Sequence, residues 1–250
     1  MNPKHLSVFA VLLLFFITPS CKKGEEDPAM SLLSRKARLS GEWKLSSINS
    51  KEENDSPSLG FNTTIEGTGE QITVSKELHY DDGSTLTGTE TQTINEYSLK
   101  INKDGSWERY IDYDFVSKGS TEIEISEVTG GTKVITKGTW AFAGKTKGSY
   151  KNKERLILTV TEDEVRNKER LEGAAPKDGS FPMVYNVYPE EYIHQTYEAH
   201  TNVEIYELVM LKSKEMKWKA TEGFVRHYNE SLDGIKFSKV SNLEIVWIAE

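Results

Sequence analysis

Residues 90–115 read ETQTINEYSLKINKDGSWERYIDYDF and carry the clearest structural signal in the chain. Apolar and polar residues alternate up to Ile101, which is the period of a β-strand with one buried face. The turn at Lys103-Asp104-Gly105-Ser106 predicts a hairpin, because Asp-Gly readily supplies the positive backbone angle that tight hairpins favour. The returning strand places its large apolar residues on one face: Trp107, Ile111, Tyr113 and Phe115.

The same two-residue period extends outward from this hairpin in both directions. It recurs at 71–80, 155–161, 203–211, 215–224 and 243–248, and in a strand pair, 121–128 and 132–143, about Gly130-Gly131. Roughly nine or ten strands with turn residues between them are typical of an antiparallel barrel or sandwich. We expect little helix: one short turn within 31–39 and a polar loop or short helix at 162–172. The sequence therefore predicts an all-β protein.

The N-terminus carries the features of an export signal. Residues 6–17 (LSVFAVLLLFFI) follow a short basic start and are fewer than the roughly 20 apolar residues of a spanning helix. Small and turn-prone residues then lead to Cys21, the only cysteine of the chain. This arrangement resembles the lipobox of bacterial lipoproteins. The resemblance implies removal of residues 1–20 and a diacyl or triacyl Cys21 that anchors the protein to a membrane. An ordinary signal peptide with an incidental cysteine is the alternative.

Residues 21–38 begin with a charged segment that we interpret as a lipidated tether. Lys22 stands where an aspartate favours the inner membrane in Gram-negative lipoproteins, so the resemblance implies the outer membrane. The periplasmic and cell-surface faces both stay open. The net charge of −8 argues against nucleic-acid partners, which need a basic face. With Cys21 acylated, no thiol remains for a disulfide, so an apolar core must stabilise residues 39–250, which we assign to one domain.

Several motifs within 39–224 resemble the lipocalin-like domains of bacterial envelope lipoproteins. Residues 39–45 (LSGEWKL) look like the opening lipocalin strand with its Gly-x-Trp signature, and 98–107 resemble the central Asp-Gly hairpin. Residues 138–142 (GTWAF) with 156–158, and then 206–218 (YELVMLKSKEMKW), resemble a later strand pair and the closing hairpin. The resemblance implies an antiparallel meander barrel, lipocalin-like, with extra C-terminal strands. Residues 181–201 and 225–250 have no counterpart in that pattern.

The resemblance also implies a ligand site inside the sheet. Lipocalin-like barrels commonly hold small apolar ligands, and a barrel of about eight strands leaves room for one. The alternative is that the aromatic residues fill the core, which we favour for Trp43 and, less strongly, for two of the candidates, Trp107 and Trp140. The candidate ligand-binding residues are Trp107, Ile111, Tyr113, Trp140 and Phe142.

A second candidate site is the tyrosine-rich stretch at 181–206. Tyrosines provide contact area at low entropic cost, which suits a partner-binding surface, whereas half-buried strand tyrosines are the alternative. The candidate partner-binding residues are Tyr185, Tyr188, Tyr192 and Tyr197. His194 and His200 lie near glutamates, but their spacing matches no strong zinc signature, so we predict no metal site.

The sequence contains no nucleophile elbow, phosphate-binding loop or dinucleotide fingerprint. We therefore expect no enzyme activity, and no cofactor apart from the lipid on Cys21. Two hypotheses remain. The first is a membrane-anchored lipoprotein whose barrel binds a small apolar ligand in the cell envelope. The second is a non-catalytic module that binds or scaffolds an envelope protein or glycan through its tyrosine-rich surface. An interior pocket would favour the first, and an exposed aromatic patch the second.

Overall fold

The computed structural model describes residues 33–55, 59–80, 82–121, 124–143, 154–198, 202–220 and 240–250. The predicted signal peptide, Cys21 and most of the predicted tether lie outside these residues. The helix of the described part is α2 (Arg35–Leu39), within the expected helical turn. The strands up to the middle of the chain are β1 (Gly41–Asp55), β2 (Leu59–Thr68), β3 (Gln71–Tyr80), β4 (Thr85–Ile101), β5 (Ser106–Ser120) and β6 (Glu124–Phe142). The later strands are β7 (Arg155–Asn167), β8 (Arg170–Pro176), β9 (Val184–Tyr188), β10 (Glu191–Thr196), β11 (Val203–Leu211), β12 (Glu215–Ala220) and β13 (Val240–Ala249).

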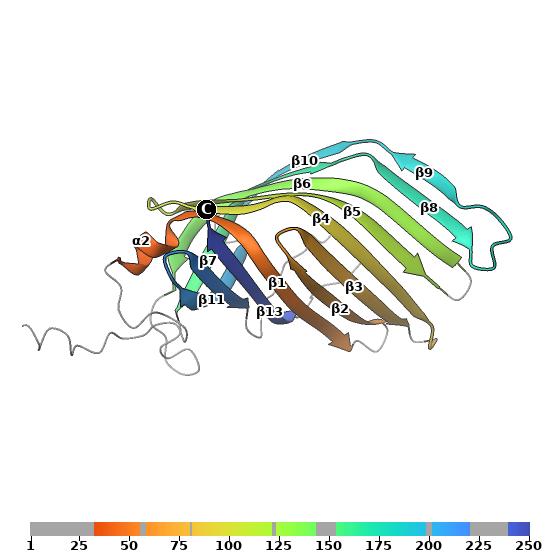
Figure 1. Ribbon diagram of the computed structural model, residues 1–250, viewed down its shortest axis with the longest axis horizontal. Coiled ribbons are helices and arrows are strands. Elements are labelled where there is room, and N and C mark those ends of the chain that lie inside the picture. Colours follow the sequence, from red (N-terminus) through yellow and green to blue (C-terminus); the bar gives the residue numbers. More distant parts are fainter. Residues whose placement is uncertain are drawn as a thin grey trace, which may run out of the picture.

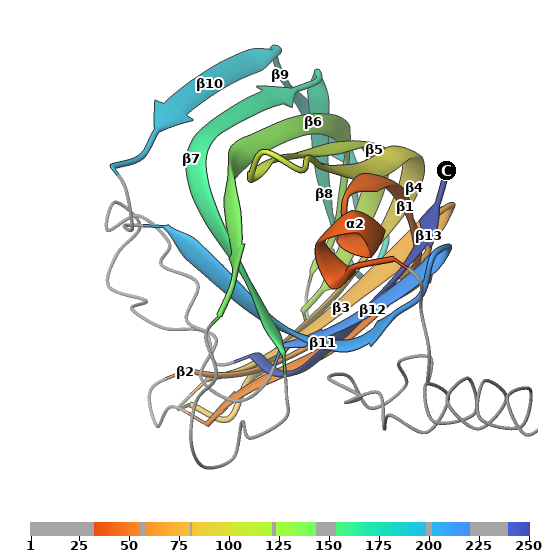
Figure 2. The ribbon, with the colours of Figure 1, turned by 90° about the vertical axis from the view of Figure 1, so that its left-hand side faces the viewer.

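All of these strands join one antiparallel sheet that closes on itself. Hydrogen bonds run from β1 through β2 to β7, continue through β11, β12 and β13, and return to β1. This ring of ten strands confirms the predicted all-β, antiparallel, barrel-like fold. The strands fan out from the end that carries α2 toward the end that carries β9 (Figure 1). Figure 2, seen from the α2 side, shows the strands arranged around α2.

The ring widens because the hairpin of β2 and β3 is inserted between β1 and β4. Near α2, the start of β1 pairs directly with the end of β4, from Gly41 opposite Ile101 to Lys44 opposite Ser98. From Ser47 onward β1 pairs with β2 instead, and β4 pairs with β3. The ring near α2 therefore omits β2 and β3, whereas the ring farther along includes both.

The predicted hairpin about Gly130-Gly131 is wrong, because β6 runs straight through both glycines. These glycines serve close packing instead of a turn. A Cβ on Gly130 would lie 3.1 Å from the Phe115 ring, and one on Gly131 would lie 2.5 Å from an Asp114 carboxylate oxygen. Glycine thus lets neighbouring side chains lie across the strand at this point.

The predicted loop or short helix at 162–172 is also wrong. β7 continues to Asn167 and β8 starts at Arg170, and both pair with the long strand β6. Most residues of β7 beyond Val160 are half buried, on both faces of the sheet. Such a strand needs no strict alternation of apolar and polar residues, so its polar sequence did not look like a strand. β9 and β10 extend the sheet further by pairing with β8 and β7.

The end of the ring near α2 is a packed apolar core. One cluster of buried residues extends from Leu39 to Trp247, and Trp43, with 2% of its surface exposed, is part of it as expected. The Trp43 indole N–H donates to the Leu39 carbonyl oxygen at 2.9 Å. The guanidinium of Arg38 donates to the Leu211 carbonyl, which joins α2 to β11. Within the described ranges, no helix has the length and apolar character needed to cross a bilayer.

Candidate functional site

The five candidate ligand residues lie on the inward face of β5 and β6, but at two levels. Trp107 and Trp140 are 2% and 8% exposed and lie in the core near α2. Their indole N–H groups donate to the carbonyls of Thr139 at 3.1 Å and Asn102 at 2.8 Å. Phe142 packs edge-on against Trp140, with ring centroids 5.4 Å apart. These three residues therefore belong to the packed core and do not line a ligand site, and their contacts hold the strands together.

The remaining two candidates, Ile111 and Tyr113, lie farther along β5 and stay half buried. Burial raises the pKa of the Tyr113 hydroxyl above its usual value. In the ladder, Ile94 on β4 stands opposite Tyr113, Val134 on β6 stands opposite Ile111, and Val165 on β7 stands opposite Val134. We call this set the inner apolar surface: Ile94, Ile111, Tyr113, Phe115, Val134 and Val165. Ile94 and Tyr113 connect this surface to the core cluster.

A buried ion pair, which no sequence motif predicts, lies between the two levels. Arg109 follows Trp107 on the inward face of β5, and Glu204 faces it from β11. Two guanidinium nitrogens of Arg109 each donate to one carboxylate oxygen of Glu204 at 2.9 Å. The Tyr206 hydroxyl donates to the same carboxylate at 3.0 Å. The two charged side chains are only 11% and 6% exposed. The sequence holds one signal of this pair: Arg109 lies two residues from both Trp107 and Ile111, so it shares the inward face of the strand with them.

The facing carboxylate holds Arg109 in its charged form. Burial by itself would lower the pKa of Arg109, but the facing Glu204 carboxylate more than offsets burial and raises it. The guanidinium also lies over the Trp107 ring, at 5.5 Å from its centroid. The Nε atom of Arg109 is buried and has no hydrogen-bond partner. Among the described residues it is one of several buried donors without a partner, which include the indole N–H groups of Trp218 and Trp247.

Three of the four candidate partner-binding tyrosines are exposed. Tyr185, Tyr188 and Tyr192 expose 49%, 39% and 56% of their surface on β9 and β10. The Arg170 guanidinium lies over the Tyr188 ring, with its central carbon 4.4 Å from the ring centroid. Tyr197 differs, because it is half buried against the core. The structure thus exposes the first three on β9 and β10, the strands at the two ends of the strand order, and buries part of the fourth.

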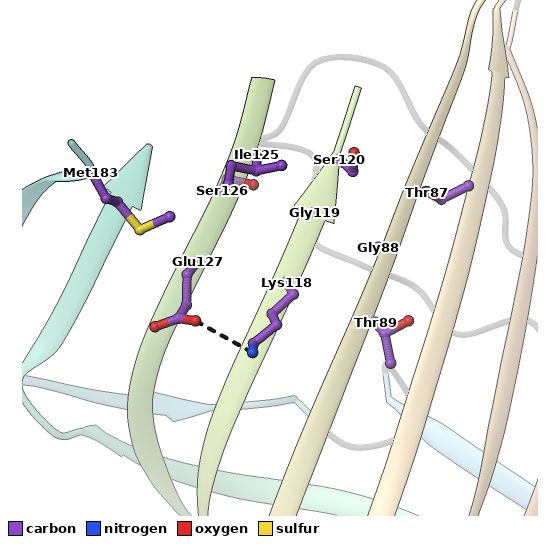
Figure 3. Close-up of a pocket in the computed structure, with 10 residues that line it drawn as sticks. All are labelled: Thr87, Gly88, Thr89, Lys118, Gly119, Ser120, Ile125, Ser126, Glu127 and Met183. Atoms are coloured by element: carbon purple, nitrogen blue, oxygen red, sulfur yellow. Dashed lines mark ion pairs between the residues drawn. The ribbon is translucent and has the colours of Figure 1, made fainter. Parts of the chain in front are cut away.

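An open groove of about 360 Å³ lies near the β9 end of the molecule. Figure 3 shows it across the ends of β4, β5 and β6, with Met183 to one side. The ion pair between Lys118 and Glu127, at 3.6 Å, crosses it. Its walls combine short polar side chains and glycines with two apolar side chains, Ile125 and Met183.

Within the described part of the chain, no three His, Cys, Asp or Glu side chains gather as metal ligands would. His194 lies 3.3 Å from Glu162 on the exposed face of β10 and β7. His200 is outside the described residues.

Comparisons of the chain with protein-family models, with curated proteins and with solved structures found no match.

Proposed function

We propose that this chain is an exported, lipid-anchored protein of the bacterial envelope whose barrel-like sheet binds a small apolar ligand. The observation that carries the proposal is the inner apolar surface, where large apolar side chains line the concave side of the sheet. Ile111 and Tyr113 on this surface are half buried, whereas Leu156 and Leu158 in the core near α2 are fully buried. Concave apolar surface with a few polar groups is the usual lining of a small-molecule site.

The buried ion pair supports a ligand that has a polar end. The unused Nε–H of Arg109 lies between the packed tryptophans and the inner apolar surface along β5. A buried donor without a partner is destabilising, and a ligand oxygen would satisfy it. An amphiphile with one hydrogen-bond acceptor therefore fits this interior better than a pure hydrocarbon.

The test is native mass spectrometry of the full chain purified from its host membranes in mild detergent. We expect a co-purifying small molecule that is lost in an Ile111→Ser/Tyr113→Ala variant. The matched control is Val116→Ser, because Val116 lies on the opposite face of β5 and is 40% exposed. A bare mass, unchanged after incubation with envelope lipid extract, would refute the ligand-binding proposal.

The lipid anchor is tested separately by growing cells with an alkynyl palmitate analogue. The wild-type chain should incorporate the label and Cys21→Ser should not. Incorporation that persists in Cys21→Ser, or its absence from the wild type, would overturn the anchor assignment without bearing on the ligand.

A second candidate function is partner binding through the exposed tyrosines. The observation that favours it is the group of exposed apolar residues on β9 and β10, which includes Val184 at 68% and Val187 at 61%. Exposed apolar patches of this kind commonly mark protein–protein contacts.

A further inference from the structure

The strand β9 forms an edge of the sheet. It pairs with β8 on one side, and it stands last in the strand order. It lies at the end of the molecule opposite α2 (Figure 1). Its valines and tyrosines are exposed on both faces of the strand, by 39% to 68%. The edge of such a strand presents backbone N–H and C=O groups that can pair with another strand.

This edge lacks the charges that usually protect edge strands. Residues 179–189 (GSFPMVYNVYP) contain no Asp, Glu, Lys or Arg, although 28% of the chain is charged. Lysines, inward-pointing charges and prolines normally block edge-to-edge pairing. Here the only blocking residues are Pro182 and Pro189, which stand on either side of β9 and leave the strand itself open.

We propose that β9 pairs antiparallel with β9 of a second copy of this chain, about a two-fold axis through Asn186. This inference takes up the second candidate function and names its partner, and it does not depend on the ligand. In this register Val184 faces the other copy's Tyr188, Tyr185 faces its Val187, and Asn186 faces Asn186. Pairs of an aromatic with a β-branched residue stabilise antiparallel strands. They form here on both faces, and no like charges meet.

The two prolines select this register. With the axis through Asn186, all five residues of β9 pair with one another. Moving the axis to Tyr185 sets Pro182 opposite Tyr188, and moving it to Val187 sets Pro189 opposite Tyr185. Proline has no N–H to donate to the ladder. The prolines also keep the contact short, as expected for a closed dimer instead of a growing sheet.

Cysteine cross-linking tests the axis directly in cells that express the full chain. Residues directly opposite in an antiparallel pair have Cα atoms about 4.5–5.5 Å apart, within the range of a disulfide. Asn186→Cys should therefore form a disulfide-linked dimer under mild oxidation, seen by non-reducing electrophoresis. Val184→Cys alone should not, because the two copies of residue 184 would lie about 13 Å apart along the strands. Val184→Cys together with Tyr188→Cys should cross-link again.

The controls are the wild type, which reports any background from Cys21, and Ser75→Cys on the interior strand β3, which is also exposed. An Asn186→Cys thiol that reacts with maleimide but yields no more dimer than Ser75→Cys would overturn the proposal. Equal cross-linking by Val184→Cys alone would refute the register. A disulfide to a different protein would show that the edge binds another partner. It would overturn the proposal that β9 pairs with a second copy of this chain.

Charge substitution provides an independent test with the purified full chain. Asn186→Lys and Asn186→Asp each place like charges opposite each other, and each should raise the dissociation constant roughly tenfold or more. Mixing the two variants should restore the dimer, because Lys then faces Asp. A folding defect would persist in the mixture, so recovery of the dimer excludes one. Failure to recover by two variants that each show the wild-type circular dichroism spectrum would overturn the two-fold contact. Ligand co-purification, measured on the same samples, reports the ligand-binding proposal separately.

Discussion

The buried pair of Arg109 and Glu204 leads to the sharpest prediction about stability. Glu204→Gln keeps the shape of the side chain and removes its negative charge. The Arg109 guanidinium, with 11% of its side chain exposed, would then remain buried opposite a neutral amide. Removing one partner of a buried ion pair typically destabilises a protein by about 3–5 kcal/mol. We expect about 3 kcal/mol here, because the amide oxygen still accepts one hydrogen bond.

Urea denaturation followed by tryptophan fluorescence measures this loss. With a slope of about 2 kcal/mol per molar urea, the midpoint should fall by about 1.5 M. The double variant Arg109→Met/Glu204→Leu should recover most of the loss, since apolar replacements of a buried pair are often neutral or stabilising. The matched control is Glu42→Gln, which breaks the exposed pair with Lys100 and should leave the midpoint unchanged.

Two results would refute this reasoning. One is a Glu204→Gln variant that loses less than about 1 kcal/mol, since a buried uncompensated charge costs more than that. The other is a double variant that loses as much as the two single variants combined, because coupled partners are not additive.

Three further predictions concern the outer face, a close approach and the core. Burial would raise the pKa of Asp112, but hydrogen bonds, first from Lys168, hold it below its usual value. Its contribution to stability is therefore present above the unfolded pKa and is lost as pH falls through the folded pKa. Asp112→Asn should lower the urea midpoint at pH 7. The difference from wild type should begin to shrink near pH 4, about the pKa of an unfolded aspartate, and should vanish only below the lower folded pKa. A difference that stayed constant as the pH fell through this range would contradict the assignment. Gly138→Ala should cost at least about 3 kcal/mol in urea unfolding, because its Cβ would lie 1.9 Å from a backbone oxygen. Gly88→Ala, with its nearest atom at 3.7 Å, should change stability by less than about 0.5 kcal/mol, so equal effects would disprove the steric argument. Leu158→Ala, fully buried, should lose about 2–5 kcal/mol by thermal or urea unfolding, and a smaller loss would place it outside the core.

The sequence by itself determined the local structure of the hairpins and the fold class. The turn at Asp104-Gly105 is present, with Gly105 at a φ of +101° and the Asp104 carboxylate accepting from the Ser106 N–H at 2.9 Å. The strands at 71–80 and 203–211 have the predicted bounds. Alternation and turn chemistry depend on residues that are neighbours in the chain, so they can be recognised without knowing the partners of a strand.

The tertiary structure alone decided how the strands close and what the interior contains. By its sequence Gly130-Gly131 could have formed a turn. In the structure the Phe115 ring and the Asp114 carboxylate pack against these glycines within a continuous strand. Arg109 is in phase with the inward apolar residues of β5, but its partner Glu204, 95 residues away along the chain, is identified only by the tertiary structure. The edge position of β9 likewise depends on β8 pairing with β6. Long-range pairing and buried charge are properties of two distant segments at once, and neither segment alone encodes which partner it will find.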